Sequence, residues 1–181
     1  MRFIETRIPD AWRIELEKRP DDRGFFARSF CEREFAEHGL EARYPQCNIS
    51  YNQARGTLRG MHFQRPPKPE IKLVRCVRGS VYDVILDLRP NSPMYLKWEA
   101  FELTEDNRDA LYIPEGCAHG FQTLTENAEL FYQMGALYAP ECSDGVRWDD
   151  LAFRIAWPLA QPILSGKDRA YPDFQTSPWG R

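Results

Sequence analysis

Histidine, cysteine and long apolar runs are all scarce in this sequence of 181 residues, and each shortage excludes a class of protein. The three histidines, His38, His62 and His119, lie too far apart for the His-x-His and His-x-x-x-His spacings of multi-histidine metal centres. The five cysteines are an odd number without a close pair, which fits neither a disulfide framework nor a zinc knuckle. We therefore expect no metal and a protein of the reducing cytosol.

Membrane segments and nucleic-acid footprints are missing as well. No apolar stretch approaches the ~20 residues of a membrane span, and the N-terminus is charged from Arg2 onward, so we expect no signal peptide. The 24 basic and 27 acidic residues are interspersed and give a net charge of −3, unlike the basic surface of a nucleic-acid binder. The sequence favours a cytoplasmic protein that binds neither membranes nor nucleic acid.

What the sequence does contain is a series of short period-two segments separated by turn residues. Residues 71–78 and 81–88 flank the turn Arg78-Gly79-Ser80 and predict a hairpin. Further strands are predicted over residues 14–16, 25–28, 48–51, 57–63, 95–103, 110–113, 121–124 and 128–134. One helix is predicted after Ser29, which forms a capping box with Glu32, and Gly39 occupies the position that follows a helix.

This pattern predicts a mostly β protein. We expect a cupin-type jelly-roll barrel or sandwich with one or two short peripheral helices, because evenly spaced short strands are typical of such folds. Neither a linker nor an internal repeat divides the sequence. A single domain over residues 1–181, with a short C-terminal tail from about residue 175, is therefore expected.

The densest functional signal is residues 56–64, where glycines bracket an arginine and a histidine. Alternation along a strand places Arg59 and Met61 on one face and Gly60 and His62 on the other. His62 is interpreted either as a part-buried structural histidine or as a general base, because an ordinary imidazole with a pKa of ~6.5 exchanges protons at neutral pH.

Lys72 and Tyr132 are candidates because of the faces they occupy. If Lys72 shares the inward face suggested by Val84 and Leu86 of the next segment, its ammonium needs an anion, whereas a lysine at a sheet edge would only be solvated. Tyr132 shares a face with Leu130, so its phenol also points inward, although such a tyrosine is more often part of the core.

Glycines flank the remaining candidates. His119 lies in a predicted turn between Gly116 and Gly120, where the backbone can approach a ligand or a neighbouring strand. Arg23 and Arg59 each adjoin a glycine, and although both could be ordinary surface charges, their forked donors suit a pyrophosphate.

Taken together, these residues resemble the dTDP-4-dehydrorhamnose 3,5-epimerase family of nucleotide-sugar epimerases. The similarity covers residues 1 to about 174. Its motifs are Asp22 to Phe26, Gln46 to Ser50, Gly56 to Phe63, Lys72 to Arg75, Asp83 to Arg89 with Ser92 and Pro93, Ile113 to Gly116, Ala118 to Phe121, Tyr132 with Tyr138, Gly145 to Trp148, and Leu164 to Asp168.

The resemblance implies a cupin barrel without metal or cofactor, usually a homodimer, that holds the sugar inside and the nucleotide toward its mouth. It implies that His62 removes a proton and that Asp168 binds the other nitrogen of His62. Tyr132 would return a proton from the opposite face, and Lys72 would stabilise the enolate oxygen. The substrate-binding residues that it implies are Arg23, Phe26, Arg28, Gln46, Asn48, Arg59, His119, Tyr138 and Lys167.

The expected activity is inversion of C3 and C5 of a nucleotide-linked 4-keto-6-deoxyhexose, of the dTDP-4-dehydro-6-deoxyglucose to dTDP-4-dehydrorhamnose type. Both C–H bonds lie α to the carbonyl, so an enolate forms without a redox cofactor. Alternatives are inversion of C3 or C5 alone on a dTDP- or CDP-linked sugar, a 3,4-ketoisomerase, a metal-dependent cupin oxygenase and a non-catalytic nucleotide-sugar-binding cupin. Arg28 stands where the family usually has an acidic residue, which leaves the nucleotide base open because arginine can only donate hydrogen bonds.

Overall fold

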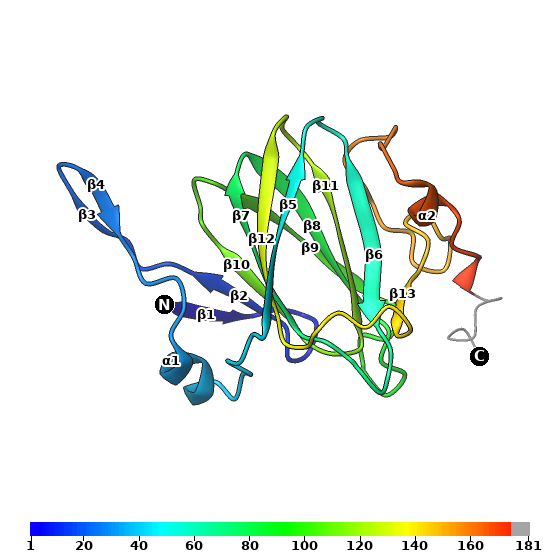
Figure 1. Cartoon of the computed structure of the whole chain (residues 1–181), viewed down its shortest axis with the longest axis horizontal. Helices are drawn as coiled ribbons and strands as arrows, with labels where there is room; N and C mark the ends of the chain where they lie inside the picture. The colour runs from blue at the N-terminus through cyan, green and yellow to red at the C-terminus, as the bar shows by residue number, and fades with distance from the viewer. Residues whose placement is uncertain (175–181) are drawn as a thin grey trace.

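A computed structural model describes residues 1–174, and the predicted tail from about residue 175 lies outside them. Two antiparallel sheets form a sandwich (Figure 1). The six-stranded sheet contains, in order, β1 (Arg2–Glu5), β2 (Trp12–Glu15), β10 (Ala110–Ile113), β7 (Lys72–Arg78), β12 (Ala128–Met134) and β5 (Gln46–Asn52). The five-stranded sheet contains β13 (Ser143–Gly145), β6 (Leu58–Gln64), β11 (Cys117–Thr123), β8 (Ser80–Asp87) and β9 (Trp98–Thr104).

The main core lies between the sheets. Val74 and Leu130 from the six-stranded sheet pack with Ile85 and Phe121 from the five-stranded sheet, and each is at most 1% exposed. Burying a side chain of this size contributes about 1.5–3 kcal/mol. The mostly β class and the cupin-type sandwich predicted from the sequence are confirmed.

Two smaller clusters cover the outer faces of the sheets. On the six-stranded sheet, Phe35 of α1 (Glu32–Glu37) packs with Ile14 and Tyr112. On the five-stranded sheet, Met61 packs with Phe153 from the C-terminal segment. This second cluster holds the C-terminal segment against β6 and brings α2 (Gly166–Arg169) beside that strand (Figure 1). No helix among residues 1–174 is long and apolar enough to cross a membrane.

The predicted hairpin around Gly79 is wrong. β7 and β8 follow each other along the chain, but β7 pairs with β10 and β12 whereas β8 pairs with β9 and β11, so the chain passes from one sheet to the other. Gly79 permits this crossing with a φ of +69°, and a Cβ there would lie 2.3 Å from Thr125. The inward positions consequently switch from even in β7 to odd in β8. Lys72 points inward as expected, but Val84 and Leu86 face outward.

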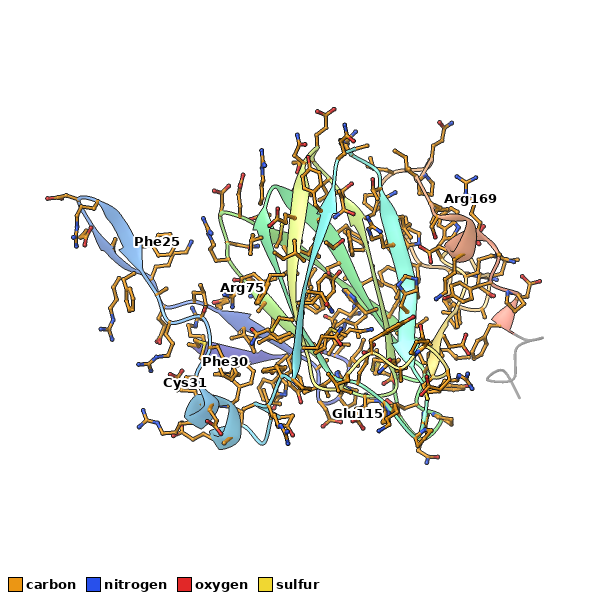
Figure 2. The ribbon with its side chains drawn as sticks, in the orientation of Figure 1. Phe25, Phe30, Cys31, Arg75, Glu115 and Arg169 are labelled. Atoms are coloured by element: carbon orange, nitrogen blue, oxygen red, sulfur yellow. The ribbon has the colours of Figure 1, made fainter. Side chains whose placement is uncertain are left out.

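The start of the helix also differs from the prediction. α1 begins at Glu32 with Cys31 as N-cap, and no side chain caps it, so the capping box at Ser29 is wrong. The Ser29 carbonyl instead accepts a hydrogen bond of 3.1 Å from the Arg75 guanidinium, a residue labelled in Figure 2. Gly39 follows the helix with a φ of +69°, as predicted.

A short arm extends from the sandwich. β3 (Arg19–Asp21) and β4 (Gly24–Phe26) pair only with each other and project away from the two sheets (Figure 1). Phe26 is 73% exposed and Phe25, labelled in Figure 2, is 45% exposed. Apolar side chains of this size on a projecting hairpin mark a surface suited to contact with another molecule.

A β-bulge lies where β6 meets β11. His62 is opposite His119 and Arg59 is opposite Phe121, so β6 uses one residue more than β11 across this interval. A Cβ on Gly60, whose φ is +140°, would lie 2.5 Å from the Cα of Gly120. The bulge overrides strand alternation, and both Arg59 and His62 face the same pocket.

Replacing Gly60 by alanine should destabilise the fold strongly. Gly24 provides a matched control, because its φ is +137° but nothing lies within 4 Å of a Cβ built there. Gly24→Ala should cost at most about 1–3 kcal/mol for the unfavourable backbone conformation. Gly60→Ala should cost about 1–3 kcal/mol more because of the overlap with Gly120. Urea unfolding measures both, and equal costs would contradict the close contact.

Candidate active site

A pocket of about 410 Å³ lies between the two sheets. This volume is within the usual range for small-molecule sites, ~300–1,000 Å³. Strands β5, β6, β7, β11 and β12 and the helix α2 all contribute to its lining. The predicted site residues that line it are Gln46, Asn48, Arg59, His62, Lys72, His119, Tyr132, Tyr138, Lys167 and Asp168.

His62 and Asp168 form a hydrogen-bonded pair at the pocket wall. The Nε2 of His62 lies 2.7 Å from Oδ1 of Asp168, a carboxylate on α2 that is 3% exposed. Burial raises the pKa of the Asp168 carboxyl, but the hydrogen bonds from His62 and Ser165 outweigh it and hold the pKa below its ordinary value. The carboxylate therefore accepts from Nε2–H, which leaves Nδ1 as the nitrogen able to take a proton.

Lys72 is bound on two sides by protein groups. Its Nζ donates to the backbone carbonyl of His62 at 2.9 Å and lies 3.1 Å from Oε1 of Glu70. The Lys72 residue is 6% exposed, so its ammonium is largely removed from water. Sequence reasoning did not single out Glu70, because it lies in a proline-rich loop that gives no periodic signal.

His119 lies in the middle of β11, so its prediction as a turn residue is wrong. Its Nε2 is 2.9 Å from both carboxylate oxygens of Asp83, and both residues are buried. Burial raises the pKa of Asp83 despite the opposing effects of His119 and Lys72. Asp83 lies in a motif of the family resemblance, but strand alternation alone does not indicate that it points inward. Its inward position depends on the switch of faces between β7 and β8.

Tyr132 comes from the opposite sheet to His62, and both side chains line the pocket. Its ring meets that of His119 edge to face, with centroids 5.8 Å apart. Burial raises the pKa of the Tyr132 phenol well above its ordinary value, and the negative charge of Asp83 adds to the rise. The phenol therefore stays protonated at neutral pH and can donate a proton.

Polar and cationic side chains form the outer part of the pocket. Gln46 accepts a hydrogen bond of 3.0 Å from the backbone of Tyr138. Arg59 donates to Asn52 at 2.8 Å, and both Arg59 and Lys167 remain exposed. Two accessible cations beside one pocket suit an anionic ligand such as a diphosphate.

Three predicted substrate-binding residues do not line this pocket. Arg23 lies in the turn of the arm and binds Asp21 at 2.7 Å, and Phe26 is in β4. Arg28 follows the arm and binds Glu34 at 2.7 Å. Within this one chain, these three residues therefore do not share the pocket of His62 and Tyr132.

The groups in the pocket are those of proton-transfer chemistry. A histidine with one free nitrogen, a protonated phenol on the facing sheet and a buried ammonium can together remove a proton, return one and stabilise an oxyanion. No group of three or more His, Cys, Asp or Glu side chains within residues 1–174 is placed to hold a metal ion.

The fold and these groups define a cupin-type enzyme of the acid–base class. The sequence profile of the dTDP-4-dehydrorhamnose 3,5-epimerase family matches residues 5–176. The chain therefore belongs to the dTDP-4-dehydrorhamnose 3,5-epimerase family, which makes it an isomerase and confirms the resemblance.

Known relatives match over nearly the whole chain. The dTDP-4-dehydrorhamnose 3,5-epimerase of Methanothermobacter thermautotrophicus is 44% identical over 98% of this chain and 96% of its own. The crystal structure of the Bacillus anthracis enzyme, with TDP and PPi bound, has a TM-score of 0.92 and 40% identity over 95% of this chain and 98% of its own. A 3′-monoepimerase from Streptomyces bikiniensis in complex with dTDP-quinovose has a TM-score of 0.87 and 32% identity over 94% of this chain and 86% of its own.

Tyr132 should remain a neutral phenol in mildly alkaline solution. An ordinary tyrosine is half ionised at about pH 10, but burial keeps the pKa of Tyr132 well above that value. Wild type and Tyr132→Phe should therefore form the same amount of tyrosinate up to about pH 10, measured by ultraviolet absorbance. A smaller signal in the variant would show that Tyr132 ionises normally.

Proposed function

We propose that this enzyme inverts C3 and C5 of dTDP-4-dehydro-6-deoxyglucose through enolate intermediates and gives dTDP-4-dehydrorhamnose. We also propose that the chain forms a single domain. The observation that carries the proposal is that His62 and Tyr132 line one pocket from facing sheets. A base and an acid on opposite sides of a sugar ring convert proton exchange into inversion, because the proton returns to the face opposite the one it left.

The residues divide the reaction between them. The Nδ1 of His62 removes the proton α to the C4 carbonyl, and Asp168 stabilises the imidazolium that results. The electron pair of the broken C–H bond forms the C=C bond of the enolate, and the π pair of the carbonyl moves to its oxygen, where Lys72 stabilises the charge. Tyr132 then gives its proton to the opposite face of the carbon, and the carbonyl re-forms. Before the second carbon reacts, solvent takes the proton from His62 and returns one to Tyr132. His119, held by Asp83, contacts the sugar.

The nucleotide is proposed to lie toward the outer part of the pocket. Arg59 and Lys167 are exposed cations there and would bind the diphosphate, while Gln46, Asn48 and Tyr138 would contact the rest of the nucleotide. The relative from Bacillus anthracis holds TDP, which supports a dTDP-linked substrate. Arg28 keeps CDP-linked sugars as a second possibility to be tested.

We propose that the enzyme is a cytoplasmic homodimer. Arg23, Phe26 and Arg28 would then bind the nucleotide in the partner's pocket, since the arm that carries two of them projects away from its own sandwich (Figure 1). The exposed Phe25 and Phe26 would be covered in the same contact. The five free cysteines suit a reducing compartment.

A mono-epimerase that inverts C3 alone is the second candidate. The similarity to the Streptomyces bikiniensis 3′-monoepimerase shows that the same fold accommodates this outcome. Inversion of C3 alone would use the same proposed base, acid and ammonium, so these residues do not distinguish the two reactions. Counting the exchanged carbons separates them.

Proton exchange with deuterated buffer tests the function directly. With dTDP-4-dehydro-6-deoxyglucose, NMR should show solvent deuterium at both C3 and C5, whereas deuterium at C3 alone would identify the mono-epimerase. Parallel reactions with CDP-, UDP- and GDP-linked 4-keto sugars determine the nucleotide. Binding without exchange at either carbon would show a non-catalytic sugar-binding protein.

The same assay separates the acid from the base. His62→Ala should abolish exchange at both carbons, by about a thousandfold or more, because no base remains. Tyr132→Phe should still exchange deuterium but lose inversion, since His62 can return a proton only to the face from which it took one. Inversion at the wild-type rate in Tyr132→Phe would contradict the proposed acid.

Mixed dimers test the proposed role of the arm. An Arg23→Ala, Phe26→Ala variant and a His62→Ala variant should each be inactive or weak, because each lacks one part of every site. Mixing them under conditions that allow subunit exchange should restore activity, since one site then combines an intact arm with an intact base. No recovery after verified exchange would show that the arm serves its own chain.

A further inference from the structure

We propose that Glu70 is the positioning residue that orients the catalytic Lys72 ammonium and compensates its charge. The inference rests on the proposed function and deepens it by naming a residue that the enolate step requires. Oε1 of Glu70 lies 3.1 Å from Nζ of Lys72, and both side chains are nearly buried, at 8% and 7% exposure. Among residues 1–174, Glu70 is the carboxylate within ion-pair distance of Lys72.

The hydrogen-bonding capacity of the ammonium supports this role. A lysine ammonium has three N–H donors. One donates to the backbone carbonyl of His62 at 2.9 Å. The ion pair with Glu70, whose Oε1 lies 3.1 Å from Nζ, keeps the ammonium beside this carboxylate in the pocket that both residues line. The hydrogen bond and the ion pair together limit the positions of the ammonium, and its other donors remain for a ligand.

The loop that carries Glu70 is itself held in place. Gln64 at the end of β6 donates to the carbonyl of Lys68 at 3.1 Å and to that of Leu137 at 3.4 Å. On the other side of Glu70, the carbonyl of Ile71 accepts from Gly135 at 3.0 Å. Prolines at positions 66, 67 and 69 restrict the same loop further. Glu70 therefore presents its carboxylate from a fixed position.

Charge is needed as well as direction. A buried ammonium without a compensating anion is strongly unfavourable. The other charged or titratable groups that interact electrostatically with Lys72 are Asp83 on β8, which also pairs with His119, and Cys117 on β11, a buried thiol. His62 on β6 presents only its carbonyl to Lys72. Glu70 thus supplies the direct counter-charge of the Lys72 ammonium.

The test compares Glu70→Gln with Glu126→Gln, which makes the same chemical change at an exposed turn residue that does not line the pocket. Glu70→Gln should lower the deuterium-exchange rate of the bound 4-keto sugar by about tenfold or more, because the ammonium loses the ion pair that positions it for the enolate oxygen. Its affinity for dTDP should change by less than about twofold, since the nucleotide contacts are elsewhere. Glu126→Gln should match the wild type in both.

A double-mutant cycle shows whether Glu70 acts through Lys72. In a Lys72→Met background, adding Glu70→Gln should change the residual exchange rate by less than about twofold. Thermal unfolding should show that Glu70→Gln alone is less stable than the Glu70→Gln, Lys72→Met pair, because the pair contains no unmatched buried charge. This comparison also separates a catalytic loss from a failure to fold.

Three results would overturn the inference: wild-type exchange in Glu70→Gln, the same fold-loss with and without Lys72, or a parallel loss of dTDP affinity. Failure of the wild-type enzyme to exchange at either carbon is a distinct result. It would overturn the proposed function and, with it, a role for Glu70 in that reaction.

Discussion

The close contact between β6 and β11 is the constraint on which the rest of the pocket depends. Gly60 and Gly120 meet where any side chain would collide with the facing strand, and the bulge beside them gives β6 one extra residue. That extra residue turns both Arg59 and His62 toward the pocket, and it keeps His62 opposite His119. In a regular strand, one of these two side chains would point to the outer face. The bulge that the two glycines permit therefore brings His62, the proposed base, and Arg59, the proposed phosphate-binding residue, into one pocket.

Charge compensation is the second condition that the pocket satisfies. Three pairs surround it, the half-exposed His62 with the buried Asp168, and the buried pairs His119 with Asp83 and Lys72 with Glu70. His62, His119 and Lys72 therefore each have a carboxylate partner before substrate binds. This pairing offsets the cost of holding polar and charged groups in a largely buried site. The Tyr132 phenol is different, because burial and the neighbouring Asp83 keep it neutral, which is the state a proton donor requires. The proposed base and the proposed acid thus lie on opposite sheets.

The sequence predicted the fold class and the position of most strands, but not how the strands pair. Period-two patterns located residues 110–113 and 128–134 at their observed bounds and showed that Tyr132 points inward. A turn at Gly79 gives the same sequence pattern whether the flanking strands pair with each other or enter different sheets, so the predicted hairpin was wrong. Lys72 nevertheless points inward, because the even positions of β7 face the other sheet. His62 and Asp168 are 106 residues apart, and only the family resemblance could pair them before the structure did. Glu70 carried no periodic signal at all.

Arg28 and the proposed proton-transfer groups lie on different parts of the chain, so a change at Arg28 leaves the geometry of those groups unchanged. The proposed base, the acid and the ammonium come from rigid strands of the sandwich, whereas Arg23 and Phe26 are on the projecting arm and Arg28 directly follows it. Arg28 is bound by Glu34, which also binds the N-terminal ammonium. The hydrogen bond from the N-terminal ammonium, and to a smaller extent that from Arg28, lower the pKa of Glu34 to about 2. An arginine fixed in this way still offers only donors, so under the proposed function it would favour acceptor atoms on a base or a phosphate oxygen. A change at this position would then alter the nucleotide preference and leave the proposed proton-transfer groups as they are.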